Sequence, residues 1–264
     1  MIHVADYGTG PVVLMLHGIG GSCDSFSPQF SGLGDSLRIL AWDAPGYGHS
    51  DDPDRPFDLD DYADAAADVI RAHCGDDGAH VLGMSWGGVV ATRLALRHPG
   101  LVRSLILGDS TVGSGTDADT ASAMRSRAAD LAANGPADFA ARRAPRLLSP
   151  EAPADLVDRA TDIMAGSVRL PGYGHAAESM AATDHTGDLA HIDVPTLVLC
   201  GDADTVTGVP ASQVLAGGIP GAVFVTLRGA GHLANQERPD AFNAWTESFV
   251  HITERLREHT PAHV

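Results

Sequence analysis

The chain has 264 residues, 44% of them hydrophobic and 19% charged, which suits one large α/β domain or such a domain with an insertion. Its formal net charge is −17, and its 17 basic residues are all arginine and form no cluster, so nucleic acids and anionic membranes are not expected partners. The N-terminus lacks a basic start followed by an apolar run, and no stretch approaches the roughly 18 apolar residues of a membrane span. We therefore expect a cytoplasmic protein.

Short apolar runs along the chain predict β-strands. They lie at 12–16, 38–42, 80–82, 102–107, 196–200 and 222–227. The later runs are continuous in Val, Ile and Leu, which is typical of parallel strands covered on both faces. Helical stretches, including 59–73 and 89–98, lie between several of them. This alternation predicts an α/β protein with a mostly parallel, doubly wound sheet.

Residues 114–187 interrupt the alternation. This segment is rich in Ala, Arg and Asp, and turns containing Gly or Pro divide it into predicted helices at 119–134, 137–148, 153–168 and 173–182. A helical insertion between sheet strands is most simply a cap over the C-terminal ends of the strands, where such folds bind ligands. Two independent domains are the alternative, but the strand pattern resumes at Pro195. We expect a core domain in two parts, 1–113 and 188–264, with a helical cap at 114–187.

The stretch at 83–88, G-M-S-W-G-G, lies between a predicted strand and a predicted helix. A G-x-S-x-G in this context is a nucleophile-elbow pattern, because its glycines permit a tight turn that holds the serine hydroxyl at a helix N-terminus. The pattern also arises by chance in chains rich in Gly and Ser, but the strand before it and the helix after it favour the elbow. Ser85 is the candidate nucleophile.

A serine hydroxyl needs a base to take its proton and a third group to orient that base. His232 is the candidate base, because it follows the last predicted strand in a Gly-rich loop, whereas other histidines lie at helix ends or turns. Asp204 is the candidate acid, and Asp202 beside it is expected to cap the turn through backbone amides. Asp109, which also follows a strand, remains an alternative acid. The order Ser85, Asp204, His232 is the one expected for an elbow on a parallel sheet.

Acyl transfer also requires hydrogen-bond donors for the oxyanion. The backbone N–H of Trp86, directly after the nucleophile, is one candidate donor, and that of Ile19 in the loop H-G-I-G-G is the other. A plain Gly-rich turn is the alternative interpretation of this loop. It lacks the Lys-Ser/Thr of a phosphate loop and the glycine spacing of a dinucleotide fingerprint, so no nucleotide is expected.

Together these motifs make the chain resemble the α/β-hydrolase superfamily along nearly its whole length. The motifs are H-G-I-G-G at 17–21, D-A-P-G-Y-G-H-S at 43–50, G-M-S-W-G-G at 83–88, G-D-A-D at 201–204 and G-A-G-H at 229–232. The chain looks most like the 3-oxoadipate enol-lactonase and small carboxylesterase group, which is related to cofactor-free haloperoxidases. The resemblance implies an α/β-hydrolase fold with a helical cap inserted after strand 6. It also implies Ser85 as nucleophile, Asp204 as acid, His232 as base, and the Ile19 and Trp86 amides as oxyanion hole.

The activity that the resemblance implies is hydrolysis of a small-molecule carboxylic ester or lactone through an acyl-enzyme on Ser85. Haloalkane dehalogenases and epoxide hydrolases carry aspartate at the elbow, so those activities are not expected. Two alternatives stay open: a C–C bond hydrolase that cleaves a vinylogous diketone with the same residues, and a ligand-binding signalling receptor of this fold. Relatives form dimers through the cap or an edge strand, so a homodimer is one expected assembly.

Cap residues are expected to set specificity. The candidates for substrate binding are Arg125, Tyr173 and His175, with Arg127, Arg142 and Arg143 also on cap helices. An arginine facing the cleft would suit a carboxylate-bearing substrate, whereas a solvated helix face is the ordinary position of such a side chain.

No metal or organic cofactor is expected. Cys23, Cys74 and Cys200 are scattered and odd in number, so they form neither a disulfide framework nor a C-x-x-C metal pair. Cys200 ends an apolar run, which predicts core packing. No other cluster of His, Cys and Asp has the spacing of metal ligands.

Overall fold

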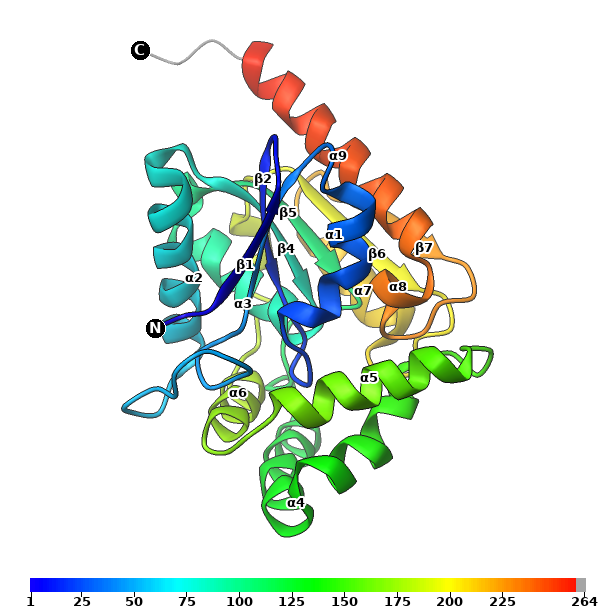
Figure 1. Cartoon of the computed structure of the whole chain (residues 1–264). Helices are drawn as coiled ribbons and strands as arrows, with labels where there is room; N and C mark the ends of the chain where they lie inside the picture. Colours follow the sequence, from blue (N-terminus) through cyan, green and yellow to red (C-terminus); the bar gives the residue numbers. More distant parts are fainter. Residues whose placement is uncertain (260–264) are drawn as a thin grey trace.

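A computed structural model describes residues 1–259 and contains one seven-stranded sheet with the order β1-β3-β2-β4-β5-β6-β7 (Figure 1). β1 pairs antiparallel with β3, and every other neighbouring pair in this sheet is parallel. The strands are β1 Val4–Gly8, β2 Val12–Leu16, β3 Arg38–Trp42, β4 Ala79–Met84, β5 Val102–Gly108, β6 Thr196–Gly201 and β7 Val223–Leu227. The predicted α/β class and mostly parallel sheet are confirmed.

The central strands are buried on both faces, as their continuous apolar sequences require. In β2, Val13 and Met15 join one hydrophobic cluster while Leu14 and Leu16 join the other, because successive side chains of a strand point to opposite faces. The chain therefore has two cores, one on each side of the sheet.

Helices cover both faces of the sheet, and a further group lies at one end of it (Figure 1). Helices α2, α3 and α7 contribute to one core and α1 and α9 to the other. The helices are α1 Ser27–Leu33, α2 Leu59–Cys74, α3 Trp86–Arg97, α4 Ala118–Arg143, α5 Ala154–Ser167, α6 Gly172–Ala181, α7 Gly208–Gly218, α8 Ala234–Glu237 and α9 Pro239–His259. Short 3₁₀ turns are η1 Cys23–Phe26, η2 Gly75–Asp77, η3 Pro99–Leu101, η4 Ala144–Leu147 and η5 Leu189–His191. In the described part of the chain, none of these helices is both long and apolar enough to cross a bilayer.

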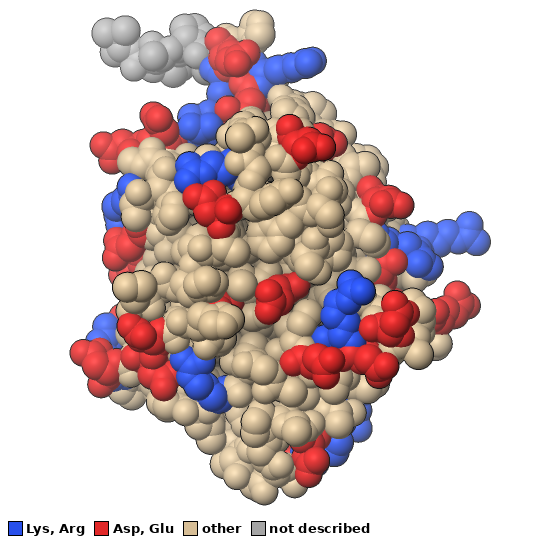
Figure 2. Space-filling view, in the orientation of Figure 1, with Lys and Arg blue, Asp and Glu red and all other residues tan. Residues whose placement is uncertain are grey.

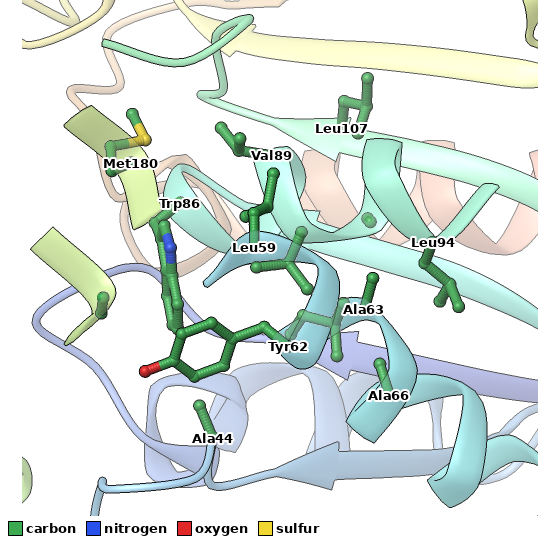
Figure 3. Close-up of a cluster of buried hydrophobic side chains, with 14 of the residues drawn as sticks. Ala44, Leu59, Tyr62, Ala63, Ala66, Trp86, Val89, Leu94, Leu107 and Met180 are labelled. Carbon is green, nitrogen blue, oxygen red and sulfur yellow. The ribbon is translucent and has the colours of Figure 1, made fainter. Parts of the chain in front are cut away.

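Helix α2 illustrates how local sequence and packing agree. The Asp58 carboxylate accepts a hydrogen bond from the Asp61 amide, and the Asp61 carboxylate accepts one from the Asp58 amide, which satisfies free N–H groups of the first turn. The apolar face of the helix carries Tyr62, whose ring lies against Trp86 at the start of α3 (Figure 3). Figure 3 also places Met180 of α6 beside Trp86, so this core continues into the helices at the end of the sheet.

Helices α4, α5 and α6, hereafter the inserted helices, lie between β5 and β6 in the chain. The insertion therefore follows the fifth strand and not a sixth, because only β1 to β5 form before it. The break predicted at Gly135 is a kink within α4, where Gly135 has φ +73° and the helix resumes at Pro136. The strand β1 was not predicted, since its sequence V-A-D-Y-G is half exposed and lacks an apolar run.

Acidic and arginine side chains are interspersed on the face drawn in Figure 2, and no broad basic area is visible there. Several of them are paired. Arg97 of α3, for example, bridges Asp60 and Asp64 of α2. Such exposed pairs contribute little to stability, so the two cores carry most of the folding free energy.

Candidate active site

The elbow at the end of β4 forces an unusual backbone conformation on Ser85. Its backbone φ is +52° and its ψ is −117°, a conformation that residues other than glycine rarely adopt. A Cβ on Gly83 would lie 2.3 Å from the carbonyl oxygen of Gly87, and one on Gly87 would lie 2.1 Å from that of Leu16. The Ser85 amide donates to the carbonyl of Gly108 at 2.8 Å. Glycine is therefore required on both sides of a serine whose position the sheet fixes.

Ser85, His232 and Asp204 form a continuous chain of hydrogen bonds. The Oγ of Ser85 lies 2.9 Å from Nε2 of His232, and Nδ1 of His232 lies 3.0 Å from Oδ2 of Asp204. His232 is 4% exposed and the Asp204 side chain is fully buried. Because the ionised carboxylate can only accept, Nδ1 carries the proton and Nε2 is free to accept from the serine hydroxyl.

Asp204 is held as a carboxylate by its surroundings. Its Oδ1 accepts from the amides of Val206 and Thr207, and its Oδ2 accepts from the hydroxyl of Thr207 and the amide of Gly208. Burial alone raises the pKa of Asp204, but the hydrogen bond and charge of His232, together with these donors, outweigh it and leave the pKa below its usual range. The carboxylate is therefore ionised at neutral pH and can stabilise a positive charge on the imidazole.

The alternative acid, Asp109, is occupied elsewhere. Its two oxygens accept from the amides of Gly201 and Ala234 at 2.8 and 3.0 Å. Burial raises the pKa of Asp109 to about 7, although the charge of His232 opposes the shift. Asp109 thus ties the end of β6 to the start of α8 and is not the hydrogen-bond partner of His232. Asp202 is exposed and accepts a backbone N–H in the turn after β7.

The loop after β2 brings its backbone against the serine. A Cβ added to Gly18 would lie 3.3 Å from the Cβ of Ser85, which is tighter than most such contacts, so glycine suits this position. Within residues 1–259, the amides of Ile19 and Trp86 donate to no other group. They therefore remain available for a substrate oxygen. The carbonyl of Ile19 accepts from the buried hydroxyl of Tyr47 at 2.9 Å, which fixes the loop from behind.

His17 is a second positioning residue in this loop that sequence reasoning did not assign. Its Nδ1 donates to the carbonyl of Gly18 at 2.8 Å, and its Nε2 accepts from the amide of Ala44 at 3.0 Å. Burial lowers the pKa of His17, which keeps the ring neutral in the tautomer that this pair of bonds requires. His17 lies in the H-G-I-G-G motif and Tyr47 in the D-A-P-G-Y-G-H-S motif. The sequence therefore pointed to both residues but did not indicate what their side chains do.

Glu237 positions the loop of the candidate base and was also missed. Its carboxylate accepts from the amide of Gly231 at 2.7 Å and from that of Ser149 at 3.0 Å. The amide of His232 donates to the carbonyl of Leu147 at 2.7 Å. These bonds connect the loop to η4 and to the segment that follows it. An acidic residue at the end of a short helix carries no sequence signal for such a role.

The side chain of Trp86 joins the elbow to the inserted helices. Its Nε1 donates to the hydroxyl of Ser179 in α6 at 3.1 Å. The indole is stacked with Tyr47 at 5.8 Å between ring centroids and meets Tyr62 edge-on at 4.9 Å (Figure 3). The residue directly after Ser85 therefore also anchors α6.

A cavity of about 290 Å³ lies between the strand-end loops and the inserted helices, and it includes Ser85 and His232 in its wall. Of the expected substrate contacts, Tyr173 lines this cavity. Arg125 lies outside it, exposed and paired with Glu178 at 2.8 Å. His175 does not line it either. The arginines that do line it are Arg127 and Arg143.

Residues 11–239 match the model of a known family, described as the alpha/beta hydrolase fold. The chain belongs to this family. It is 27% identical over 247 residues to 3-oxoadipate enol-lactonase 1 of Acinetobacter baylyi, covering 91% of this chain and 88% of that protein. It is 29% identical over 247 residues to the 2-(acetamidomethylene)succinate hydrolase of Mesorhizobium japonicum, covering 90% of this chain and 87% of that protein.

The fold of this alpha/beta hydrolase is also similar to solved structures. A thermophilic esterase from Thermogutta terrifontis, in a malate-bound structure, superposes with a TM-score of 0.86 at 26% identity, covering 96% of this chain and 93% of that one. The alpha/beta hydrolase is thus related to enol-lactonases and esterases.

In the described part of this alpha/beta hydrolase, two groups of side chains place their potential ligand atoms close enough to hold a metal ion. One group is His3, Cys23 and Asp43, and the other is Asp109, Cys200 and Asp204. Burial raises the pKa of both the Cys23 and the Cys200 thiol to about 12, whereas a metal binds the thiolate. The carboxylates already accept backbone N–H groups. We therefore assign no metal to either group.

Proposed function

We propose that this alpha/beta hydrolase cleaves a carboxylic ester or lactone of a small molecule through an acyl-enzyme on Ser85. The observation that carries the proposal is the unbroken hydrogen-bond chain from Ser85 through His232 to Asp204, which opens into the cavity. Nucleophile, base and orienting acid within hydrogen-bond reach form the arrangement that activates a serine hydroxyl. The relationship to enol-lactonases and esterases supports the same reaction class.

In the proposed mechanism, Nε2 of His232 takes the hydroxyl proton as Ser85 attacks the carbonyl carbon. The tetrahedral oxyanion accepts hydrogen bonds from the amides of Ile19 and Trp86, which have no other acceptor among the described residues. His232 then protonates the leaving alkoxide. Water enters, and the same groups release the acid from the acyl-enzyme. Asp204 stays ionised throughout and stabilises the imidazolium.

We propose further that the inserted helices act as a cap on a core formed by 1–113 and 188–264, of which the structure describes the second part to residue 259. The cap would exclude water and shape the cavity for substrate. The bonds of Glu237 to the chain beyond α4 and of Trp86 to α6 support a cap held in a defined place.

The test is a hydrolysis profile against p-nitrophenyl esters of increasing acyl length, a set of lactones and a vinylogous diketone, with Ser85→Ala as the matched variant. We expect turnover of esters or lactones that falls by at least about 10⁴-fold in Ser85→Ala, with an unchanged melting temperature. Turnover of the diketone alone would replace this proposal with C–C hydrolysis. Absence of turnover together with stabilisation by one small ligand would favour a receptor.

A further inference from the structure

Helix α4 carries four arginines of interest, Arg125, Arg127, Arg142 and Arg143. Two of them face solvent, hereafter the outward pair, and two face the cavity, hereafter the inward pair. Arg125 and Arg142 are on the surface and form ion pairs with Glu178 and Asp130 at 2.8 and 2.7 Å. Their chain neighbours Arg127 and Arg143 line the cavity that contains Ser85. Neither of these two forms an ion pair with a carboxylate in the part of the chain that the structure describes.

The inward pair is held in place by aromatic side chains. The guanidinium of Arg143 lies over the ring of Phe139 at 5.2 Å, and that ring meets Tyr173 edge-on at a centroid distance of 5.2 Å. Burial, and then the charge of Arg127, lower the pKa of Arg143. Burial raises the pKa of the Tyr173 hydroxyl, against the charges of Arg143 and Arg127 and a hydrogen bond with Arg127.

Two like charges that are partly buried and unpaired oppose each other, and an anion between them removes that cost. The rest of the cavity wall offers no such charge, and it combines apolar side chains with neutral polar ones such as Thr116, Thr120 and Asn235. Its apolar members include Met124, Leu147, Ile163, Met164, Met180 and Val206. With a volume of about 290 Å³, the cavity fits a small substrate that carries one anionic group besides its reacting ester or lactone.

We propose that Arg127 and Arg143, with the Tyr173 hydroxyl, bind a free carboxylate of the substrate that takes no part in the reaction. This inference rests on the proposed function. It identifies the substrate class as small-molecule esters or lactones that also carry a free, ionised carboxyl group. Arginine suits this role, because its planar fork of donors matches the two oxygens of a carboxylate.

A pair of substrates matched in length tests the proposal: the mono-p-nitrophenyl ester of adipic acid, and the same compound with its free carboxyl methylated. We expect the wild type to prefer the ionised ester in kcat/KM by about tenfold or more. Arg127→Gln and Arg143→Gln should each lower kcat/KM for the ionised ester by about 10- to 100-fold, mainly through KM. The methylated ester should change by less than about threefold, since it offers no charge.

Arg125→Gln is the matched control, because it removes an arginine two residues from Arg127 that faces solvent. It should leave both substrates within about twofold. Equal losses on the ionised and methylated esters in the cavity variants would overturn the carboxylate site, as would an equal loss in the control.

Adipate itself gives a readout that needs no turnover. We expect it to raise the melting temperature of the wild type and of Arg125→Gln, but not of the double variant Arg127→Gln/Arg143→Gln. If neutral esters are hydrolysed by way of Ser85 and adipate stabilises all three proteins equally or none, the carboxylate site is wrong and the hydrolase stands. If no ester is hydrolysed and adipate stabilises only the proteins with both arginines, the hydrolase is wrong and the carboxylate site stands.

Discussion

The strand-end loops and the inserted helices build the two halves of the cavity in different ways. Around Ser85 the backbone is fixed by contacts that leave no alternative, such as the clash that any Cβ on Gly87 would make with the carbonyl of Leu16. The inserted helices instead present side chains through packing and surface ion pairs, such as Arg125 with Glu178. We propose that the scaffold fixes the chemistry while the inserted helices set the choice of substrate.

The largest effect should come from the scaffold. Asp204→Asn removes the carboxylate that orients His232 and stabilises its charged form, so we expect kcat to fall by about 10³- to 10⁴-fold with little change in KM. The measurement is steady-state hydrolysis of the best ester of the profile. Circular dichroism should show an unchanged fold.

Asp202→Asn is the matched control for that prediction, because the residue lies two positions away and accepts only a backbone N–H in a turn. It should retain activity within about twofold. A full loss in Asp202→Asn, or wild-type activity in Asp204→Asn, would contradict the assignment of the acid.

A smaller effect should appear where the chain returns from the inserted helices to the scaffold. The Nε2 of His185 donates to the carbonyl of Val89 in α3 at 3.3 Å, and its amide donates to that of Val112. Arg93 and Asp188 are the charged groups that face the ring. Burial, and then the charge of Arg93, lower the pKa of His185 to about 4.

The neutral ring of His185 makes stability depend on pH. Since the folded pKa of about 4 lies below the unfolded value of about 6.5, its contribution is present above pH 6.5 and is lost as the pH falls toward 4. We expect the free energy of unfolding to drop by about 2 kcal/mol more in the wild type than in His185→Gln between pH 7.5 and pH 5. Urea unfolding at both pH values measures it. Equal drops would show that the ring is not buried as a neutral group.

The sequence predicted the scaffold well for physical reasons. The strands β2 and β3 were predicted to the residue, because a continuous apolar run has one stable environment inside a covered parallel sheet. The positions of Ser85, Asp204 and His232 follow from strand ends that meet at one edge. The strand β1 was not predicted, because its formation depends on pairing with β3 and not on an apolar pattern of its own side chains.

The cavity wall was predicted only in part: of the cap candidates, Arg127, Arg143 and Tyr173 line it and the others do not. Arg125 and Arg127 are two residues apart on one helix, so roughly 200° separates their directions and only packing decides which one faces inward. The helix α4 is polar on most of its surface, and its kink at Gly135 changes the direction of the second half. A pattern of residues cannot fix a face under these conditions. Glu237 was missed for a similar reason, since one of its partners, Ser149, comes from a segment 88 residues away in the chain.

The proposed function requires that His232 activate the hydroxyl of Ser85 and that Ser85 become acylated. The most direct measurement is the intact mass and peptide map of the protein after reaction with a small fluorophosphonate, which traps an activated serine. We expect one adduct per chain, located on Ser85, absent in Ser85→Ala and formed at least about 100-fold more slowly in His232→Ala. An adduct on another residue, or one that forms at the same rate without His232, would contradict it.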